Sequence, residues 1–176
     1  MKKIYEITKC LSGNVLGIGV DNIITKHLEL NDRVLECNLL DSESVISGSK
    51  GKNKQKRLKK IKITKLRKKF KKKKVDFILC NVEHIKKYTK TFIKDSIYIN
   101  KDMLYIYNIN DQDLLEELEK KYKRYNAIIE IIKDKETTIL KIDNKNSKTN
   151  IFKDIIYFII DSFLQIINII SDILVN

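Results

Sequence analysis

Apolar runs separated by amphipathic stretches follow one another along most of the chain. Asn14–Val20 and Val75–Cys80 are apolar and rich in branched side chains, which predicts two buried strands. Val34–Leu40 and Met103–Asn108 predict two more. Lys59–Thr64 alternates polar with apolar residues, which is typical of a short strand with one exposed face.

Helical spacing occupies the intervals between these runs. Met1–Ser12 and Asp21–Leu30 predict short helices, the second capped by Asp21 or its neighbour. Leu66 and Phe70 lie four residues apart on a further short helical stripe, and apolar residues recur at helical spacing again after Asn81. The helix that begins after Asn110 or Asp111 carries acids in its first turn, bases in its last turn and three Glu–Lys pairs four residues apart.

The chain then predicts a hairpin. Ala127–Asp143 contains two apolar runs joined by a turn near residues 134–136. Alternating strands and helices closed by a hairpin predict an α/β fold with an open, Rossmann-like, mostly parallel sheet and an antiparallel strand at its C-terminal end. We therefore expect one α/β domain over residues 1–143, with a basic flexible loop at 41–58, then a polar linker at 144–150.

The last segment, Ile151–Asn176, predicts an apolar amphipathic helix. Its polar residues fall on one narrow stripe, formed by Asp154, Asp161, Gln165, Asn168 and Asp172. Asp161 and Asp172 argue against a membrane-spanning helix, because each would be costly in the membrane interior. The pattern favours burial or self-association, with membrane contact as the alternative, because so apolar a helix needs cover.

Positive charge is concentrated in one stretch. The net charge is +13, with 36 Lys and Arg against 23 Asp and Glu, and 16 of the basic residues lie in Lys50–Lys74, which has no acid. Lysine outnumbers arginine 32 to 4 and there is no proline, a usage expected of AT-rich coding DNA, so the stretch reflects either mutational drift or an anion-binding patch. The partners expected of a patch are RNA or an acidic membrane. The candidate anion-binding residues are Lys56, Arg57, Lys59, Lys60, Arg67, Lys68, Lys71 and Lys72.

Cysteine usage indicates a reducing compartment. Cys10, Cys37 and Cys80 lie far apart without neighbouring histidines, so they predict neither a disulfide framework nor a metal site. The N-terminus has no continuous apolar stretch typical of a signal peptide. A cytoplasmic protein is expected, with a peripheral position at the inner membrane face as the further possibility.

The order of elements resembles the class I S-adenosylmethionine-dependent methyltransferase family. The first motif of that family is a strand ending in an acid followed by Gly-x-Gly-x-Gly, and "VLGIGVDNI" aligns with it. Gly17 then stands at the acidic position, Gly19 at the first glycine, and Asp21 and Ile23 at the later glycines. The resemblance implies a cofactor site at Gly17, Gly19 and Asp21, with Asn38 near the ribose. The departures at Gly17, Asp21 and Ile23 favour a diverged member of the family that keeps the fold, with S-adenosylmethionine either still bound or lost.

The same resemblance implies substrate-side residues after the strand Val75–Cys80. Asn81, Glu83 and His84 are the candidate catalytic residues, with His84 as a general base, although a solvated histidine is the simpler interpretation. Two hypotheses follow. The favoured one is a degenerate, non-catalytic methyltransferase-like scaffold that binds through the basic stretch and the C-terminal helix, as a pseudoenzyme. The alternative is an active methyltransferase of unknown acceptor.

Overall fold

A computed structural model describes residues 2–40, 63–133 and 137–147, the backbone of 54–57, and the helical positions 156, 159–160, 162–164, 166–167 and 170. The described strands form one seven-stranded sheet in the order β3-β2-β1-β4-β5-β7-β6. Strands β1 to β5 are parallel, and β7 is antiparallel to both of its neighbours. The strands are β1 (Gly13–Ile18), β2 (Val34–Leu40), β3 (Lys54–Arg57), β4 (Val75–Asn81), β5 (Asn100–Ile109), β6 (Ile128–Lys133) and β7 (Thr138–Asp143). The predicted Rossmann-like fold with an antiparallel hairpin strand is confirmed.

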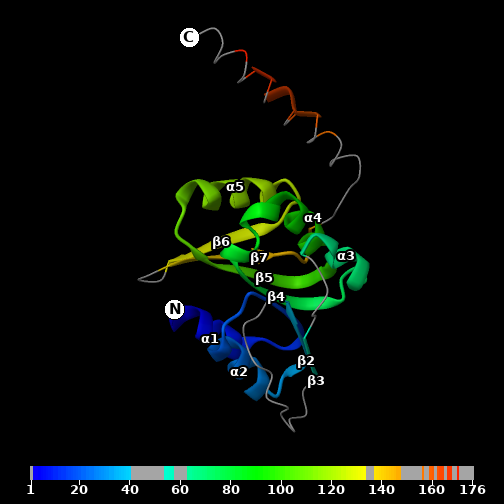
Figure 1. Cartoon of the computed structure of the whole chain (residues 1–176), viewed down its shortest axis with the longest axis vertical. Coiled ribbons are helices and arrows are strands. Elements are labelled where there is room, and N and C mark those ends of the chain that lie inside the picture. The colour runs from blue at the N-terminus through cyan, green and yellow to red at the C-terminus, as the bar shows by residue number, and fades with distance from the viewer. Residues whose placement is uncertain are drawn as a thin grey trace.

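Helices cover both faces of this sheet (Figure 1). They are α1 (Lys2–Cys10), α2 (Asn22–Leu30), α3 (Leu66–Lys69), α4 (Thr89–Ile99) and α5 (Gln112–Lys123), with short 3-10 turns η1 (Ile63–Lys65), η2 (Val82–His84) and η3 (Lys86–Tyr88). α1 and α2 lie on one face, and α3, α4 and α5 on the other (Figure 1). The molecule therefore has three layers, with the sheet in the middle.

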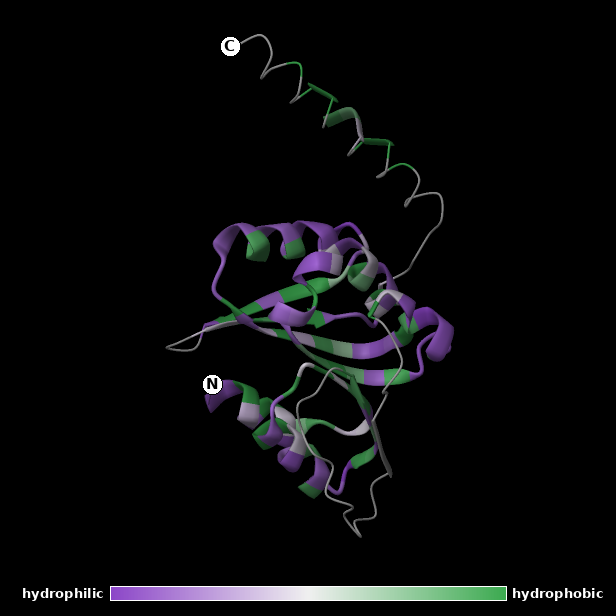
Figure 2. Cartoon of the chain, in the orientation of Figure 1, coloured by the Kyte–Doolittle hydropathy of each residue, from purple (hydrophilic) through white to green (hydrophobic). Residues whose placement is uncertain are grey.

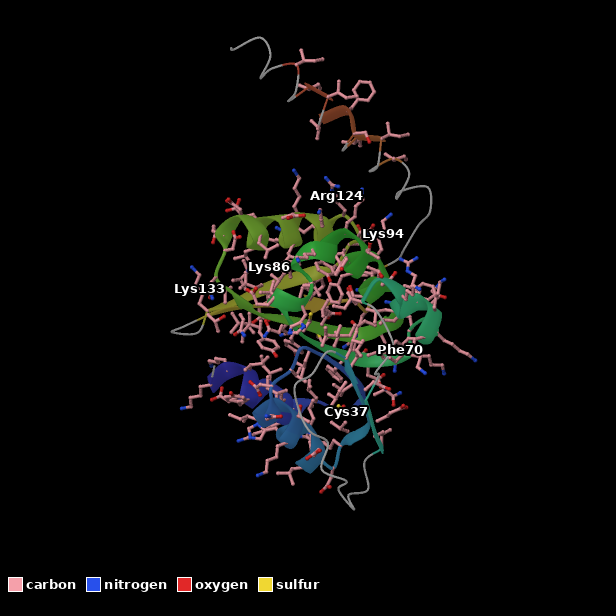
Figure 3. All side chains as sticks on the ribbon, in the orientation of Figure 1. Cys37, Phe70, Lys86, Lys94, Arg124 and Lys133 are labelled. Atoms are coloured by element: carbon pink, nitrogen blue, oxygen red, sulfur yellow. The ribbon has the colours of Figure 1, made fainter. Side chains whose placement is uncertain are left out.

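Two apolar cores result from the alternation of side chains along the strands. Leu16 and Ile18 of β1 join the core beneath α3, α4 and α5. Val15 of β1 points the other way and packs with Ile24 and Leu28 of α2. Phe70, at the end of α3, is half-buried against the first core, where Figure 3 labels it. Because both faces of the sheet are covered, the central strands are almost entirely apolar, which is the pattern from which they were predicted.

Side-chain caps and ion pairs define two of the helices. Asp21 precedes α2 and accepts a hydrogen bond from the Ile24 N–H at 2.7 Å, and Asp111 caps α5 in the same way. On α5, Glu119 pairs with Lys123 at 2.5 Å, and Glu117 pairs with Lys121. The predicted caps and two of the three predicted Glu–Lys pairs are therefore present.

Two predicted elements need correction. The third strand is Lys54–Arg57, inside the range predicted as a loop, whereas Ile63 and Thr64 of the predicted strand form a 3-10 turn. Residues 41–53 and 58–62 lie outside the described residues. The helix expected after Asn81 begins only at Thr89, because two 3-10 turns come first.

A polar cluster ties the end of β7 to the starts of β4 and β5. The Asn100 side chain donates to the carbonyls of Asp76 at 3.0 Å and Met103 at 3.1 Å, and it accepts from the Asn144 side chain at 2.9 Å. Asn100 and Asn144 are both fully buried. Residues 144–147, which the sequence places in a linker, thus pack against the sheet.

The C-terminal segment carries exposed apolar side chains on helical turns. Figure 2 shows its coloured turns, mostly hydrophobic, standing away from the sheet and its helices. Among the described residues of this segment, the large apolar side chains range from 44% exposed at Ile160 to 65% exposed at Phe163. Among the described residues, no helix is both long enough and apolar enough to cross a membrane.

Candidate functional site

The candidate site lies where the sheet changes its winding direction. β1 and β4 are parallel neighbours, but the chain after β1 enters α2 on one face and the chain after β4 leads to α4 on the other. The carboxyl ends of two such strands form the crevice where open α/β sheets bind ligands. Gly19 follows β1 and His84 follows β4, so both residues lie at this edge.

Gly19 is held in a left-handed backbone conformation that favours glycine. Its φ is +60°, its N–H donates to the Leu40 carbonyl at 2.9 Å, and its carbonyl accepts from the Tyr107 hydroxyl at 3.4 Å. A Cβ placed on Gly19 would stand 2.0 Å from Cδ2 and 2.4 Å from Nε2 of His84. The imidazole therefore fills the space directly over the Gly19 backbone.

Gly17 and Asp21, the other predicted cofactor residues, have structural neighbours. A Cβ on Gly17 would meet the methyl groups of Leu39 and Val20, each at 3.0 Å, so an acidic side chain would point into apolar surroundings. Asp21 caps α2 with its carboxylate, and its carbonyl accepts from the Thr25 hydroxyl at 2.8 Å. A carboxylate that already accepts the helix-terminal N–H occupies one of the donors that an anionic ligand would use.

Asn38 is not brought to this edge. It lies inside β2, opposite Leu16 of β1, and is only 7% exposed. Since side chains alternate along a strand, Asn38 shares its face with Leu40, which belongs to the core under α3, α4 and α5. The residue named for ribose contact is therefore enclosed two positions before the end of β2.

The three predicted catalytic residues lie together but do not form a relay. The Asn81 side chain accepts from the Glu83 N–H at 3.2 Å and so caps the turn η2. The Glu83 carboxylate is exposed and pairs with Lys86 at 2.6 Å, so its partner is a lysine and not the imidazole. His84 contacts Gly19 instead. His84 thus lies at the crevice, and in the described part of the chain its neighbour Glu83 pairs with Lys86 and does not orient the imidazole.

The predicted anion-binding residues divide into three groups. The side chains of Lys56, Arg57, Lys59 and Lys60 lie outside the described residues. Arg67 is engaged within the fold: its Nε contacts Asp95 at 2.8 Å, a terminal nitrogen donates to the Lys94 carbonyl at 2.6 Å, and its guanidinium lies 5.0 Å from the centre of the Tyr98 ring. Lys68, Lys71 and Lys72 are exposed. Three of the predicted cations are thus available to an anion, and Arg67 acts as a packing residue.

Sequence reasoning missed Tyr107, which lies beneath the crevice. It is 1% exposed, and burial raises the pKa of its hydroxyl far above the usual range, with smaller contributions from Cys80 and Asp21. Its hydroxyl donates to the Gly19 carbonyl and so supports the glycine turn. The Tyr107 side chain lies on the face of the sheet opposite to Leu104 and Ile106. A tyrosine within an otherwise apolar strand was the available signal, because a buried hydroxyl needs a partner.

No protein-family model and no curated protein matches the sequence significantly. Solved structures do match. An O-methyltransferase family protein from Burkholderia thailandensis has a TM-score of 0.56 at 8% identity, over 81% of this chain and 55% of that chain. TrmK of M. capricolum, in complex with S-adenosyl-homocysteine, has a TM-score of 0.53 at 10% identity, over 86% and 71% of the two chains. The fold is methyltransferase-like.

A third match is a Staphylococcus aureus protein described as a caffeoyl-CoA O-methyltransferase, with a TM-score of 0.51 at 9% identity over 81% of each chain. Identities this low establish a shared fold and nothing further. The chain spans about half of the Burkholderia protein. Within the described part of the chain, no three His, Cys, Asp or Glu side chains are grouped closely enough to hold a metal ion.

Proposed function

We propose that this protein is a non-catalytic methyltransferase-like scaffold whose cofactor crevice is closed by its own residues. The observation that carries the proposal is the position of the His84 imidazole over Gly19. The resemblance assigns this space to the methionine part of S-adenosylmethionine, which needs close approach to the glycine backbone. A ligand there would have to displace the imidazole first.

Two further features support the same proposal. An acid cannot be accommodated at position 17 without facing the Leu39 and Val20 methyl groups, so the anchor for the ligand amino group is absent. Asn38, the nearest polar residue for ribose contact in the described part of β2, is buried within the strand. The residues at the crevice therefore do not fit S-adenosylmethionine, while the sheet and both cores remain intact.

The second candidate is an active methyltransferase. It is favoured by one observation: Gly19, Asn81 and His84 still meet at the switch point of a fold that holds S-adenosyl-homocysteine in TrmK. In this case the His84 side chain would swing aside and lie next to the bound ligand.

Titration with S-adenosylmethionine and S-adenosyl-homocysteine separates the two candidates. A ligand at 100 times its dissociation constant stabilises a protein by about 2.7 kcal/mol, which raises the melting temperature of a domain of this size by about 5–10 °C. The scaffold proposal expects no shift for the wild-type protein at millimolar ligand. A shift in the wild type, accompanied by methyl transfer to any acceptor, would establish the enzyme.

His84→Ala extends this test, with His27→Ala as the matched control. His27 lies in α2 with its ring edge-on to Tyr5, and it has no contact with Gly19 among the interactions of the described residues. If the imidazole alone closes the crevice, His84→Ala gains a ligand-induced shift and His27→Ala does not. If the missing acid also matters, neither variant shifts.

A further inference from the structure

A cluster of exposed lysines covers the end of the molecule opposite the crevice. Its members lie on α3 and on the turn that leads into the start of β4, whereas Gly19 and His84 follow the ends of their strands. We call Lys68, Lys69, Lys71, Lys72 and Lys74 the lysine cluster; all five are exposed. No acid lies in the sequence between them, so their charges are neutralised only by groups from outside this segment.

The chain leaves the folded domain beside this cluster. Lys73, in the middle of the cluster, has a φ of +53°, and its N–H donates to the Tyr98 carbonyl at 3.0 Å. Its Nζ donates to the Asn144 carbonyl at 3.0 Å. The Asn144 N–H donates in turn to the Asp102 carbonyl at 2.8 Å. Lys73 thus points inward, unlike its neighbours, and holds the exit of the chain next to them.

The described positions of the C-terminal segment that follows carry exposed apolar side chains. Eight described positions are apolar and between 44% and 65% exposed: Ile156, Ile159, Ile160, Phe163, Leu164, Ile166, Ile167 and Ile170. At 100° per residue these positions fall within an arc of about 160° on one side of a helix. A surface of this kind needs a partner, because soluble monomers rarely expose so large an apolar patch.

We infer that this end of the molecule binds an anionic membrane surface, with the apolar arc of the C-terminal segment at the lipid interface and the lysine cluster against the headgroups. The inference rests on the proposed function, because it names the partner of the scaffold. A nucleic acid would neutralise the lysines but leave the apolar arc in water. A second copy of the segment would cover the arc but leave the lysines without counter-charge. An anionic lipid surface satisfies both features together.

The acids of the C-terminal segment are consistent with this orientation. On the helix that the sequence predicts, Asp154, Asp161 and Asp172 fall on the stripe opposite the apolar arc, so we expect them to face water when the arc meets lipid. That stripe adds no attraction to anionic lipid. The lysine cluster has to supply that attraction, and the Lys73–Asn144 hydrogen bond keeps the cluster next to Asn144, from which the chain continues toward the segment.

The test is flotation of the full chain with phosphatidylcholine vesicles, with and without phosphatidylserine. Binding is expected with the mixed vesicles and is weaker with the neutral ones. Each lysine near an anionic surface contributes about fivefold to binding, so replacing Lys68, Lys71, Lys72 and Lys74 by Gln lowers the partition coefficient by about 100-fold or more. The matched control replaces four exposed lysines elsewhere, Lys2, Lys9, Lys26 and Lys87, and keeps most of the binding.

The apolar contribution has its own matched pair. Phe163→Asp places a charge in the centre of the apolar arc and abolishes vesicle binding. Gln165→Asp adds the same charge on the predicted polar stripe and leaves it within about threefold of wild type. Equal loss in both variants would overturn the apolar contact.

Three other outcomes overturn the inference. Binding to RNA without binding to vesicles assigns the lysines to a nucleic acid. A concentration-dependent dimer that shows no vesicle binding assigns the apolar arc to a second copy. Equal binding of the wild type and the four-lysine variant shows that the cluster has no part in it. A ligand-induced shift with S-adenosylmethionine, measured on the same preparation, would overturn the proposed function and leave vesicle binding as a separate result.

Discussion

The His84 imidazole fills the space that a side chain on Gly19 would need, at the edge of the sheet where β1 and β4 end. The imidazole lies so close to the glycine that even one methyl group on Gly19 would stand 2.0 Å from its Cδ2 atom. The glycine also has a φ of +60°, which costs an L-residue about 1–2 kcal/mol. Position 19 is therefore restricted twice, once by its backbone and once by the ring above it.

A double-mutant cycle separates these two restrictions. Gly19→Ala should lower the free energy of unfolding by about 2–4 kcal/mol, because it adds overpacking to the backbone cost. In the His84→Ala background the same substitution should cost only about 1–2 kcal/mol, since only the backbone cost remains. Urea denaturation of the four proteins measures the coupling. Strict additivity would show that the ring moves aside freely, which would favour the active-enzyme alternative.

The contact between these residues was not predictable from the sequence. "VLGIGVDNI" indicated a strand, a turn and a helix start, and the structure confirms each of them. Nothing in that pattern shows which side chain lies over the turn. His84 follows β4, which is distant in sequence and becomes a neighbour of β1 only through the strand order of the sheet. The pattern of apolar residues predicts elements, whereas the site depends on how they pair.

The third strand, β3, was not predictable from the pattern of apolar residues either. Lys54–Arg57 contains no apolar residue, so hydrophobic periodicity could not detect it. It pairs with β2 through backbone groups at the edge of the sheet, a position that tolerates polar side chains. Val34–Leu40, by contrast, is predicted with its observed bounds, because most of its side chains are apolar and buried.

Arg67 offers a prediction about a charge that is structural. Its Nε contacts Asp95, whose side chain is 9% exposed, at 2.8 Å. Arg67→Met removes the ion pair and leaves the enclosed carboxylate with backbone donors, among them the N–H of residue 67 at 3.5 Å. The expected loss of unfolding free energy near neutral pH is about 2 kcal/mol, below the range for fully buried pairs because the Arg67 side chain is itself 37% exposed.

The pH dependence of that loss follows from Asp95. Burial raises the pKa of Asp95 above 3.8, and Arg67 opposes this by lowering it. Without Arg67 the pKa of Asp95 in the folded protein rises further, so the folded variant loses stability as the pH rises from the unfolded-state pKa of about 4 through that raised value. As the pH falls and the carboxyl becomes protonated, the penalty disappears. From neutral to acidic pH the free energies of unfolding of the two proteins should therefore converge, and Asp95→Asn in the variant background should remove the part of the pH dependence that Asp95 causes.

The three cysteines should differ in reactivity. Cys37, labelled in Figure 3, is fully buried, and burial, aided by Glu29 and Glu36, raises the pKa of its thiol to about 12. Cys80 is also fully buried, and burial raises its pKa well above the usual value. Cys10 is exposed. Because the thiolate is the reactive form, a disulfide reagent at about pH 8 should label one of three thiols in the folded protein and all three in denaturant. Rapid labelling of a second thiol in the native state would contradict the packing, and Cys10→Ser should abolish the fast phase.

The boundary between the folded domain and its C-terminal segment can be located by truncation. Asn144 donates to Asp102 and to the Asn100 side chain, and its carbonyl accepts from Lys73. A chain ending at residue 147 retains these hydrogen bonds and should unfold at the same urea concentration as the full chain. A chain ending at residue 143 loses all three and leaves the buried Asn100 side-chain oxygen without a partner, so it should be about 2–3 kcal/mol less stable. Asn144→Ala in the full chain should show part of this loss, while Asn146→Ala, at an exposed position, should show none. If the two truncated chains are equally stable, residues 144–147 are a linker, as the sequence predicted, and the lysine cluster is not fixed to the exit of the chain.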